Sequence, residues 1–279
     1  MHRIVVKLGT NVIMRPDGRV ALGLLCGLVE QIAALRADGL EVLIVSSGAV
    51  GLGMERLGLR TRPTNVAQIQ ACAAIGQSRL MSLYDDAFDR LNCPIAQVLL
   101  TEDDFRDQER HANLRATLDA LLTLGVIPIV NENDTVSTAE LDRPAESGEA
   151  SSERERIFGD NDKLSALLMK HISADLLVLL SDVDGLYDRN PGTRGAKLIP
   201  RVEVIDDSIL ALAEGRNGRG RGGMISKLES ARIVLRAGKQ VVIANGRTPS
   251  VLERLVAGEN LGTRFAPALQ GAGFQAAAR

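Results

Sequence analysis

The chain has 279 residues, enough for one large domain or two lobes around a sizeable core. Hydrophobic residues make up 45% and charged residues 24%, the balance of an ordinary globular protein. A formal net charge of −2 provides no basic field to attract nucleic acid or an anionic membrane. Glycine is abundant at 27 residues, and only six of the 33 basic residues are lysine, so each lysine is informative.

The cysteines and histidines exclude several kinds of site. The three cysteines lie far apart in apolar stretches, as reduced core residues of a cytosolic protein do. The three histidines show no metal-ligand spacing, so no zinc site is expected. Neither a signal-peptide pattern nor an apolar run near the roughly 18 residues of a membrane span is present. We therefore expect a cytoplasmic protein that binds neither membrane nor nucleic acid.

Short apolar runs alternate with helical patterns along the first 130 residues. Strands are expected at 3–8, 41–46, 94–100 and 126–130, and helices at 20–37, 65–91 and 104–124. Continuous apolar strands separated by helices are typical of a parallel sheet covered on both faces. Right-handed crossovers should connect these strands.

The same alternation continues in the second half of the chain. Strands are expected at 176–180 and 240–244, and helices at 162–172 (with Asp160 as N-cap), 207–213, 223–237 and 249–257. We predict an α/β fold, with a doubly wound, mainly parallel sheet sandwiched by helices.

The predicted sheet forms one domain over residues 1–265. Its N-lobe should cover about 1–158 and its C-lobe about 159–265. Residues 142–156 contain no large apolar side chain and are expected to form a mobile excursion. Residues 266–279 are expected to form a flexible tail.

Six polar clusters fall where open α/β sheets bind ligands, at strand ends and helix starts. They are Lys7–Asn11, Ser46–Gly51, Asn131–Thr135, Gly159–Lys163, Ser181–Tyr187 and Gly218–Lys227. Glycine at a strand end or before a helix lets backbone N–H groups approach an anion. Most of the clusters, taken alone, are compatible with a plain turn or cap. Asn131–Thr135 carries more carboxylate and amide groups than a turn requires, and indicates a recognition loop.

Two familiar nucleotide-binding patterns are missing from the sequence. It has no GxxxxGK[ST] loop and no HRD or DFG motif, which excludes P-loop enzymes and protein kinases. The glycine spacing of Ser46–Gly51 is not the GxGxxG fingerprint, so that cluster does not imply NAD. Two glycine-flanked lysines, anion-friendly loops and several acidic residues are nevertheless the components of phosphoryl transfer.

Short motifs occur in a definite order between residues 3 and 265. They are VVKLGTN, IVSSGAVGLG, AIGQSRL, QVLLTEDD, IPIVNENDTVSTAEL, FGDNDKLSA, LLSDVDGLYDRNP, GGMISK and LGTRF. Each is weak alone, but the ordered set resembles the amino acid kinase family, and within it the members that phosphorylate glutamate. The resemblance implies ATP-dependent, Mg²⁺-requiring phosphorylation of the γ-carboxylate of L-glutamate, the first step of proline synthesis.

The resemblance also implies roles for individual residues. Lys7 and Lys227 would stabilise the transferring phosphoryl group, and Asp162 would hold both lysines. The implied glutamate-binding residues are Ser47, Gly48, Asn131, Asp134, Asp160 and Asn161. The implied nucleotide-binding residues are Lys7, Gly9, Ser181, Asp182, Arg221, Gly222, Gly223, Met224, Ile225, Ser226 and Lys227. No group is indicated as a ligand of Mg²⁺. The family further suggests feedback inhibition by proline and a homodimer or homotetramer.

Three features depart from the family pattern. Arg221 replaces the usual threonine before GGM, which makes the nucleotide loop more cationic. The linker between TAEL and FGDND is long, and we hypothesise that residues 142–156 form a flap over the glutamate site. Many members carry a C-terminal PUA domain, for which no room remains after LGTRF, so a kinase-only form is expected.

Two other functions stay open. A sister kinase would act on another carboxylate or on carbamate, but Ser47 and the NEND and GDND sequences disfavour it. A non-catalytic amino-acid sensor on the same fold is disfavoured by the presence of both lysines and Asp162.

A carboxylate acceptor, with a pKa of about 4.3, is ionised at neutral pH and needs no general base. The motifs accordingly contain no histidine.

Overall fold

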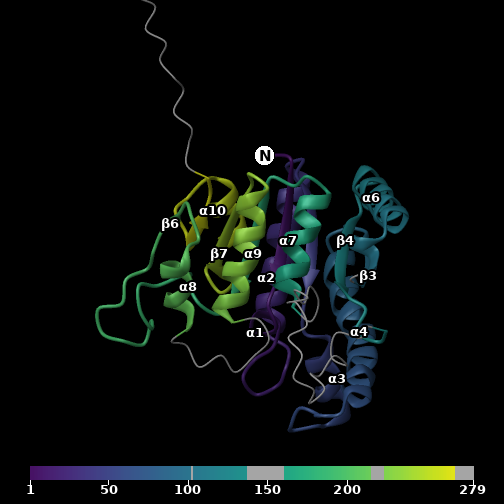
Figure 1. Ribbon diagram of the computed structural model, residues 1–279. Helices are drawn as coiled ribbons and strands as arrows, with labels where there is room; N and C mark the ends of the chain where they lie inside the picture. The colour runs from purple at the N-terminus through teal and green to yellow at the C-terminus, as the bar shows by residue number, and fades with distance from the viewer. Residues whose placement is uncertain (102, 137–159, 215–222, 268–279) are drawn as a thin grey trace, which may run out of the picture.

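The computed structural model describes residues 1–101, 103–136, 160–214 and 223–267. Helices cover both faces of one central sheet (Figure 1). The strands are β1 (Arg3–Leu8), β2 (Glu41–Ser46), β3 (Ile95–Leu100), β4 (Ile127–Glu132), β5 (Leu176–Ser181), β6 (Arg201–Val202), β7 (Gln240–Asn245) and β8 (Thr263–Phe265). The helices are α1 (Thr10–Ile13), α2 (Leu22–Ala37), α3 (Ala49–Leu57), α4 (Val66–Asp89), α5 (Asp103–Arg106), α6 (Gln108–Thr123), α7 (Asn161–His171), α8 (Asp207–Glu214), α9 (Met224–Arg236) and α10 (Val251–Val256). The predicted α/β sandwich is confirmed.

The strand order is β3-β4-β2-β1-β5-β7-β8-β6 in the part of the chain that the structure describes. All neighbouring strands are parallel except β7 and β8, which are antiparallel. The first half of the chain builds the sheet outward from β1 in one direction, and the second half builds it from β5 in the other. The order therefore reverses between β1 and β5, and ligands bind outside the carboxyl ends of strands at such a point.

Strand β1 separates two apolar cores. Ile4, Val6 and Leu8 belong to the core that contains residues of α2, α4 and α10. Val5 belongs to the opposite core, which contains residues of α6, α7, α8 and α9. Because side chains alternate along a strand, Lys7 projects from the same face as Val5. Figure 1 shows α7 and α9 side by side on that face.

The observed elements depart from the predicted ones at several points. Helix α3 was not predicted, and it begins after Gly48, whose φ of 105° lies in the left-handed region that favours glycine. Strand β4 runs on through Asn131 and Glu132, so these two residues belong to a buried strand, not to a loop. The stretch predicted as one helix at 104–124 is two helices, because the side chain of Asp107 caps α6 at its own start.

Helices α3 and α4 cross with their backbones in contact. A Cβ atom added to Gly76 would lie 1.7 Å from the carbonyl oxygen of Ala49. One added to Gly53 would lie 1.9 Å from the carbonyl oxygen of Cys72. Only glycine fits at either position, and the crossing holds α4 against the segment that follows β2.

Several expected segments lie wholly outside the described residues. These are the hypothesised flap at 142–156, Arg221 and Gly222, and the tail from 268 onward. Ala266, which we placed in the flexible tail, is instead buried, and its amide donates to the carbonyl of Val202 over 3.2 Å. No described helix is both long and apolar enough to cross a membrane.

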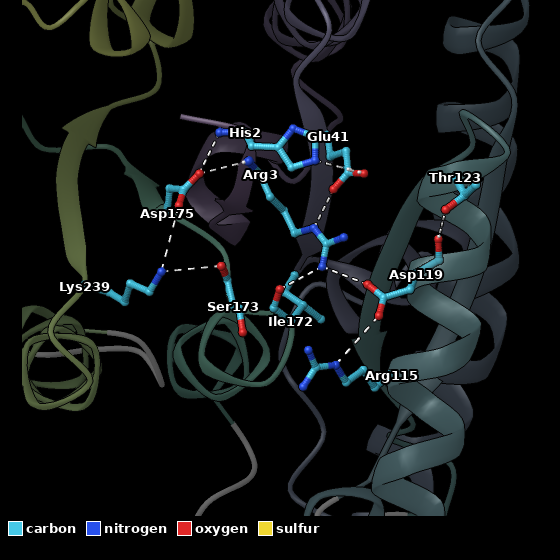
Figure 2. A network of polar contacts seen from close by, with 10 residues as sticks. All are labelled: His2, Arg3, Glu41, Arg115, Asp119, Thr123, Ile172, Ser173, Asp175 and Lys239. Atoms are coloured by element: carbon cyan, nitrogen blue, oxygen red, sulfur yellow. Dashed lines mark hydrogen bonds and ion pairs between the residues drawn. The ribbon is translucent and has the colours of Figure 1, made fainter.

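A network of ion pairs joins the amino ends of the strands (Figure 2). The guanidinium group of Arg3 lies 2.6 Å from Glu41 on β2 and 2.9 Å from Asp119 on α6. It also donates to the carbonyl of Ile172, at the end of α7, over 2.7 Å. The amides of His2 and Arg3 both donate to Asp175. The network therefore connects β1 to β2 on one side and to the start of β5 on the other, at the amino ends of these strands.

Candidate active site

Two lysines share one buried carboxylate where the strand order reverses. Lys7 lies near the end of β1, Asp162 in the first turn of α7 and Lys227 in the first turn of α9. The Nζ atom of Lys7 is 2.6 Å from Oδ1 of Asp162, and that of Lys227 is 2.8 Å from Oδ2. Only 4%, 0% and 5% of Lys7, Asp162 and Lys227 are exposed. The structure thus brings together the two lysines expected to stabilise the phosphoryl group and the aspartate expected to hold them.

The two ammonium groups keep the Asp162 carboxylate ionised. Burial alone would raise the pKa of Asp162, but the charges and hydrogen bonds of Lys7 and Lys227 outweigh burial and lower it. Two ammonium groups and one carboxylate carry a net charge of +1. A positive charge held in a desolvated position interacts strongly with an anion, because little water screens it.

Asp160 connects the starts of α7 and α9. Its carboxylate accepts a hydrogen bond from the amide of Asp162 over 2.9 Å, which caps α7 as predicted. The hydroxyl of Ser226, in the first turn of α9, donates to the other oxygen. Burial and the charge of Asp162 raise the pKa of Asp160, despite the opposing effects of Ser226 and Lys7.

Side-chain amides connect the substrate-binding candidates. Nδ2 of Asn161 lies 2.9 Å from Oγ of Ser47, 2.9 Å from Oδ1 of Asn131 and 3.2 Å from the carbonyl oxygen of Ser46. Ser47 follows β2, Asn131 lies on β4 and Asn161 begins α7. The structure therefore brings together three of the residues expected to bind glutamate, although they are far apart in sequence.

The remaining substrate-binding candidates lie close to these residues in the chain. Gly48 follows Ser47 and starts α3. Asp134 is half-buried in the turn directly after β4. Ser46, which opens the polar cluster Ser46–Gly51, is fully buried, and its Oγ lies 2.9 Å from the hydroxyl of Tyr84. Its hydroxyl therefore belongs to the core, and only its carbonyl contacts the amide cluster.

The nucleotide-binding candidates extend from β1 to β5. A Cβ added to Gly9 would lie 3.7 Å from Nζ of Lys7, so Gly9 borders the lysine pair. The amide of Gly9 donates to the carbonyl of Leu180 over 3.3 Å, which joins the end of β1 to β5. Ser181, at the end of β5, donates to Asp182 over 3.2 Å. Asn11 donates to the same carboxylate over 3.0 Å and connects the two loops.

The start of α9 supplies the other described part of the nucleotide site. Gly223 is the N-cap residue of this 13-residue helix, and it has no side chain that could cap the first turn. Met224 is buried, Ile225 is exposed, and Ser226 contacts Asp160. Backbone amides at an uncapped helix start, next to Lys227, suit a phosphate. Arg221 and Gly222, which we expected to bind nucleotide, lie outside the described residues.

Two residues with a place in this site were not singled out from the sequence. Gln77, in the AIGQSRL motif on α4, accepts a hydrogen bond from Nδ2 of Asn131 over 2.8 Å. Thr263, in the closing LGTRF motif, is fully buried. Its hydroxyl accepts from the amide of Leu186 over 2.8 Å and donates to the carbonyl of Ile199 over 2.6 Å. Thr263 therefore anchors the loop after β5. The motifs were visible in the sequence, but the partners of these two side chains were not.

Within the described ranges, no three His, Cys, Asp or Glu side chains come together in a way that could hold a metal ion. Both oxygens of Asp162 are engaged by lysines. Mg²⁺ commonly takes only one or two protein carboxylates and completes its coordination with water and substrate phosphates. The described residues fit Mg²⁺ that is held chiefly by water and substrate phosphates and by only one or two protein carboxylates.

Comparison with known proteins gives one family. The sequence model of the amino acid kinase family matches residues 2–245. A glutamate 5-kinase of Gloeobacter violaceus is 49% identical over 97% of this chain and 70% of its own length. A glutamate 5-kinase of Lactiplantibacillus plantarum is 43% identical over 94% of this chain and 96% of its own length.

Solved structures of more distant proteins have the same fold. A carbamate kinase from Giardia lamblia bound to AMP-PNP superposes with a TM-score of 0.64 at 16% identity, covering 95% of this chain and 98% of its own. An isopentenyl phosphate kinase superposes with a TM-score of 0.63 at 19% identity, covering 95% of this chain and 100% of its own. At such identities the likeness concerns the fold alone.

Proposed function

This chain belongs to the amino acid kinase family, and we propose that it transfers the γ-phosphate of ATP to the side-chain carboxylate of L-glutamate, the first step of proline synthesis. The buried pair of lysines on Asp162 carries the phosphoryl-transfer part of the proposal. Relatives named glutamate 5-kinase, at 43% and 49% identity, support glutamate as the acceptor.

The reaction needs no general base. An oxygen of the ionised γ-carboxylate attacks the γ-phosphorus, a P–O bond forms, and the bond from that phosphorus to the bridging oxygen of ADP breaks. No proton is transferred, because the acceptor is already ionised at neutral pH. The barrier comes instead from bringing an anion up to an anionic phosphate, which positioned cations and N–H groups lower.

Lys7 and Lys227 supply those cations from two different elements. Each ammonium group has three N–H donors, so it can hold Asp162 and a phosphate oxygen at the same time. Asp162 fixes the two nitrogen atoms relative to each other, which keeps the site organised before substrate arrives. Asp162 is thus a positioning residue, and the two lysines are the catalytic residues of the proposal.

The amide cluster would hold the amino-acid substrate. Ser47, Asn131 and Asn161 lie within hydrogen-bond distance of one another in the pairs given above, and Asn161 directly precedes Asp162. A substrate bound there would have its γ-carboxylate near the lysine pair. Gly48, Asp134 and Asp160 lie next to these residues in the chain and complete the proposed glutamate site.

The opposite side of the lysine pair would hold ATP. Gly9, Ser181, Asp182 and the segment from Arg221 to Lys227 form this part of the proposal; the loop after β5 and the uncapped start of α9 support it. Mg²⁺ bound with ATP would neutralise charge on the phosphates, held chiefly by their oxygens and by one or two protein carboxylates.

Two finer proposals rest on the family resemblance alone. They are feedback inhibition by proline and assembly as a homodimer or homotetramer. We also propose a location in the cytoplasm, which the three free cysteines support. We also propose a division into an amino-acid lobe at about 1–158 and a nucleotide lobe at about 159–265. Most candidates follow this division, and the exceptions are Lys7, Gly9, Asp160 and Asn161.

A coupled ADP-release assay tests the proposal. Purified protein is given MgATP with glutamate, aspartate, N-acetylglutamate or carbamate in turn. We expect turnover with glutamate to exceed that with the other acceptors by at least 100-fold, in line with the discrimination that buried polar contacts give. Preferred turnover of carbamate or N-acetylglutamate would indicate a sister kinase. Glutamate binding without any ADP release would indicate a sensor.

A further inference from the structure

Two backbone groups determine how three side-chain amides are oriented. The carbonyl of Ser46 can only accept, so Asn161 must present its NH₂ group there. The amide of Glu132 can only donate, so Asn131 must present Oδ1 to it, over 2.9 Å. The same Oδ1 accepts from Asn161 over 2.9 Å. Nδ2 of Asn131 is thereby directed to Gln77, which must offer its oxygen.

Gln77 stands at the outer end of this chain of amides, on a rigid support. It follows Gly76, the residue at which the backbones of α3 and α4 meet. Its position relative to the β2–α3 segment is therefore set by backbone contact, which is stiffer than contact between long side chains. The amide chain runs from Gln77 through Asn131 and Asn161 to Ser47. It joins three elements, α4, β4 and α7, to the segment that follows β2.

Two buried polar atoms in this series of linked amides have no hydrogen-bond partner among the described residues. They are Oδ1 of Asn161, an acceptor, and Nε2 of Gln77, a donor. An unpaired buried polar group lowers stability, so folded proteins rarely keep one without a use. An acceptor left unpaired beside a substrate site is expected where the substrate brings the donor.

We propose that Gln77 is a positioning residue for the amino-acid substrate. It fixes the side chain of Asn131, which in turn fixes Asn161, so that Oδ1 of Asn161 is held ready to accept a hydrogen bond from the α-ammonium group of the substrate. This inference rests on the proposed function, because it takes an amino acid as the acceptor. Gln77 acts through Asn131 and Asn161 and does not itself contact the reacting atoms.

The positioning role differs from a purely structural one in what it changes. If Gln77 only packed α4 against β4, its loss would lower stability and would weaken the binding of every acceptor equally. If it positions Asn161 for the α-ammonium group, its loss weakens the binding of glutamate and spares glutarate, which has both carboxylates of glutamate but no amino group.

The test compares the wild-type enzyme with Gln77→Met, which keeps the length of the side chain and removes its polar atoms. Ser78→Ala, at the next and exposed position of α4, is the matched control. Steady-state assays give the KM of glutamate, the KM of ATP, kcat, and the inhibition constant of glutarate against glutamate. Thermal unfolding reports on the fold.

For Gln77→Met we expect the glutamate KM to rise about tenfold, the effect of losing about 1.4 kcal/mol of binding. The glutarate inhibition constant, the ATP KM and kcat should stay within about twofold, as should all constants of Ser78→Ala. An unchanged glutamate KM, or equal rises for glutamate and glutarate, would overturn the inference. If Gln77→Met does not fold, Gln77→Asn, which withdraws the acceptor oxygen from Asn131, carries the same expectations.

The wild-type arm separates this inference from the function on which it rests. Absence of glutamate turnover by the wild-type enzyme would overturn the proposed function, and this inference with it. Normal turnover by the wild-type enzyme together with wild-type constants in Gln77→Met would overturn the role of Gln77 alone.

Discussion

Asn161 and Asp162 are adjacent at the start of α7, and their side chains contact different parts of the site. Asn161 contacts Ser47 and Asn131, while Asp162 contacts Lys7 and Lys227. The first helical turn changes direction by about 100° per residue, which lets neighbours in sequence face different partners. One helix start therefore links the proposed glutamate site to the phosphoryl-transfer site.

Removing Asp162 should cost more stability than removing either lysine. Asp162→Asn leaves two buried ammonium groups without a counter-charge, and we expect a loss of about 3–5 kcal/mol in the free energy of unfolding. Lys227→Met leaves Lys7 and Asp162 as a pair and should lose less stability, while kcat falls about 10²–10³-fold. Urea unfolding and the coupled assay measure both effects. Equal losses of stability, or near-normal turnover of Lys227→Met, would contradict this account.

Asp160 should make the protein less stable when it is ionised. Its pKa is raised above the ordinary value, so the folded state binds a proton more tightly than the unfolded state does. The contribution of Asp160 to stability is therefore greatest at low pH and is lost as pH rises through the folded pKa.

Asp160→Asn keeps a capping side chain and removes this penalty. The variant's unfolding free energy minus that of the wild type should increase from pH 4 to pH 7, because only the wild type loses stability as Asp160 ionises. Urea unfolding of both proteins at the two pH values measures the difference. A difference that shrinks toward pH 7 would show that ionised Asp160 is stabilising.

Among the elements, α3 and α4 depend most on glycine. At Gly76 and Gly53 a Cβ would overlap backbone atoms, which cannot move aside as the end of a side chain can. The crossing holds α3, and the Ser47–Gly48 segment that begins it, against α4. Glycine at these positions thus has a packing role beside the anion-binding role that we attributed to glycine at strand ends.

Two glycine-to-alanine changes should have opposite effects. Gly76→Ala forces α3 and α4 apart and should cost about 3 kcal/mol or more in unfolding free energy. Gly23→Ala lies within α2, where a Cβ would meet nothing within 4 Å, and should stabilise the protein by about 0.5–1 kcal/mol. Thermal unfolding of the two variants beside the wild type checks both signs. A stable Gly76→Ala variant would show that the helices can separate without cost.

In the molecule as a whole, the carboxyl ends and the amino ends of the strands carry different groups of residues. The carboxyl ends of the strands carry the lysines, the amide cluster and the nucleotide-binding candidates. The amino ends carry the Arg3 network, which connects β1, β2, α6 and the end of α7 (Figure 2). Stability and activity should therefore respond separately to changes at the two edges.

Arg3→Met tests that separation. The Arg3 side chain is 16% exposed and contacts two carboxylates and a carbonyl, so its loss should lower the unfolding free energy by about 1–2 kcal/mol. At a temperature where the variant stays folded, kcat and the glutamate KM should equal the wild-type values. A fall in kcat without loss of folded protein would mean that the two edges are coupled.

The protein should lose stability in mild acid through His171. Burial, followed by the charges of His111, Lys170 and Arg115, lowers the pKa of His171 to about 4. Below its ordinary value of about 6.5 the unfolded chain then binds the proton more readily than the folded chain. Stability from this group is present above pH 6.5 and is lost as pH falls toward 4.

His171→Gln should flatten that part of the pH profile. Unfolding free energies measured by urea at intervals between pH 6.5 and pH 4 give the slope for each protein. A slope equal to that of the wild type would exclude His171 as a cause of acid sensitivity.

The sequence by itself determined the elements that form by local pattern. Continuous apolar runs placed β1 and β2 at their observed bounds, and Asp160 was identified as the cap of α7. Helix α3 escaped prediction because it is only nine residues long and its two internal glycines lower its helix propensity. The ordered motifs supplied the candidate site residues, because such motifs stand at strand ends where ligands bind.

Only the tertiary structure decided which of these residues meet. That Lys7 and Lys227 share the two oxygens of Asp162, and that Gln77 ends the amide chain, depends on strand order and on how α4, α7 and α9 pack. Gln77 and Asn131 are 54 residues apart in the sequence, and Lys7 and Asp162 are 155 residues apart. Local propensity carries no information at such separations, because these contacts form only when the sheet and its covering helices assemble.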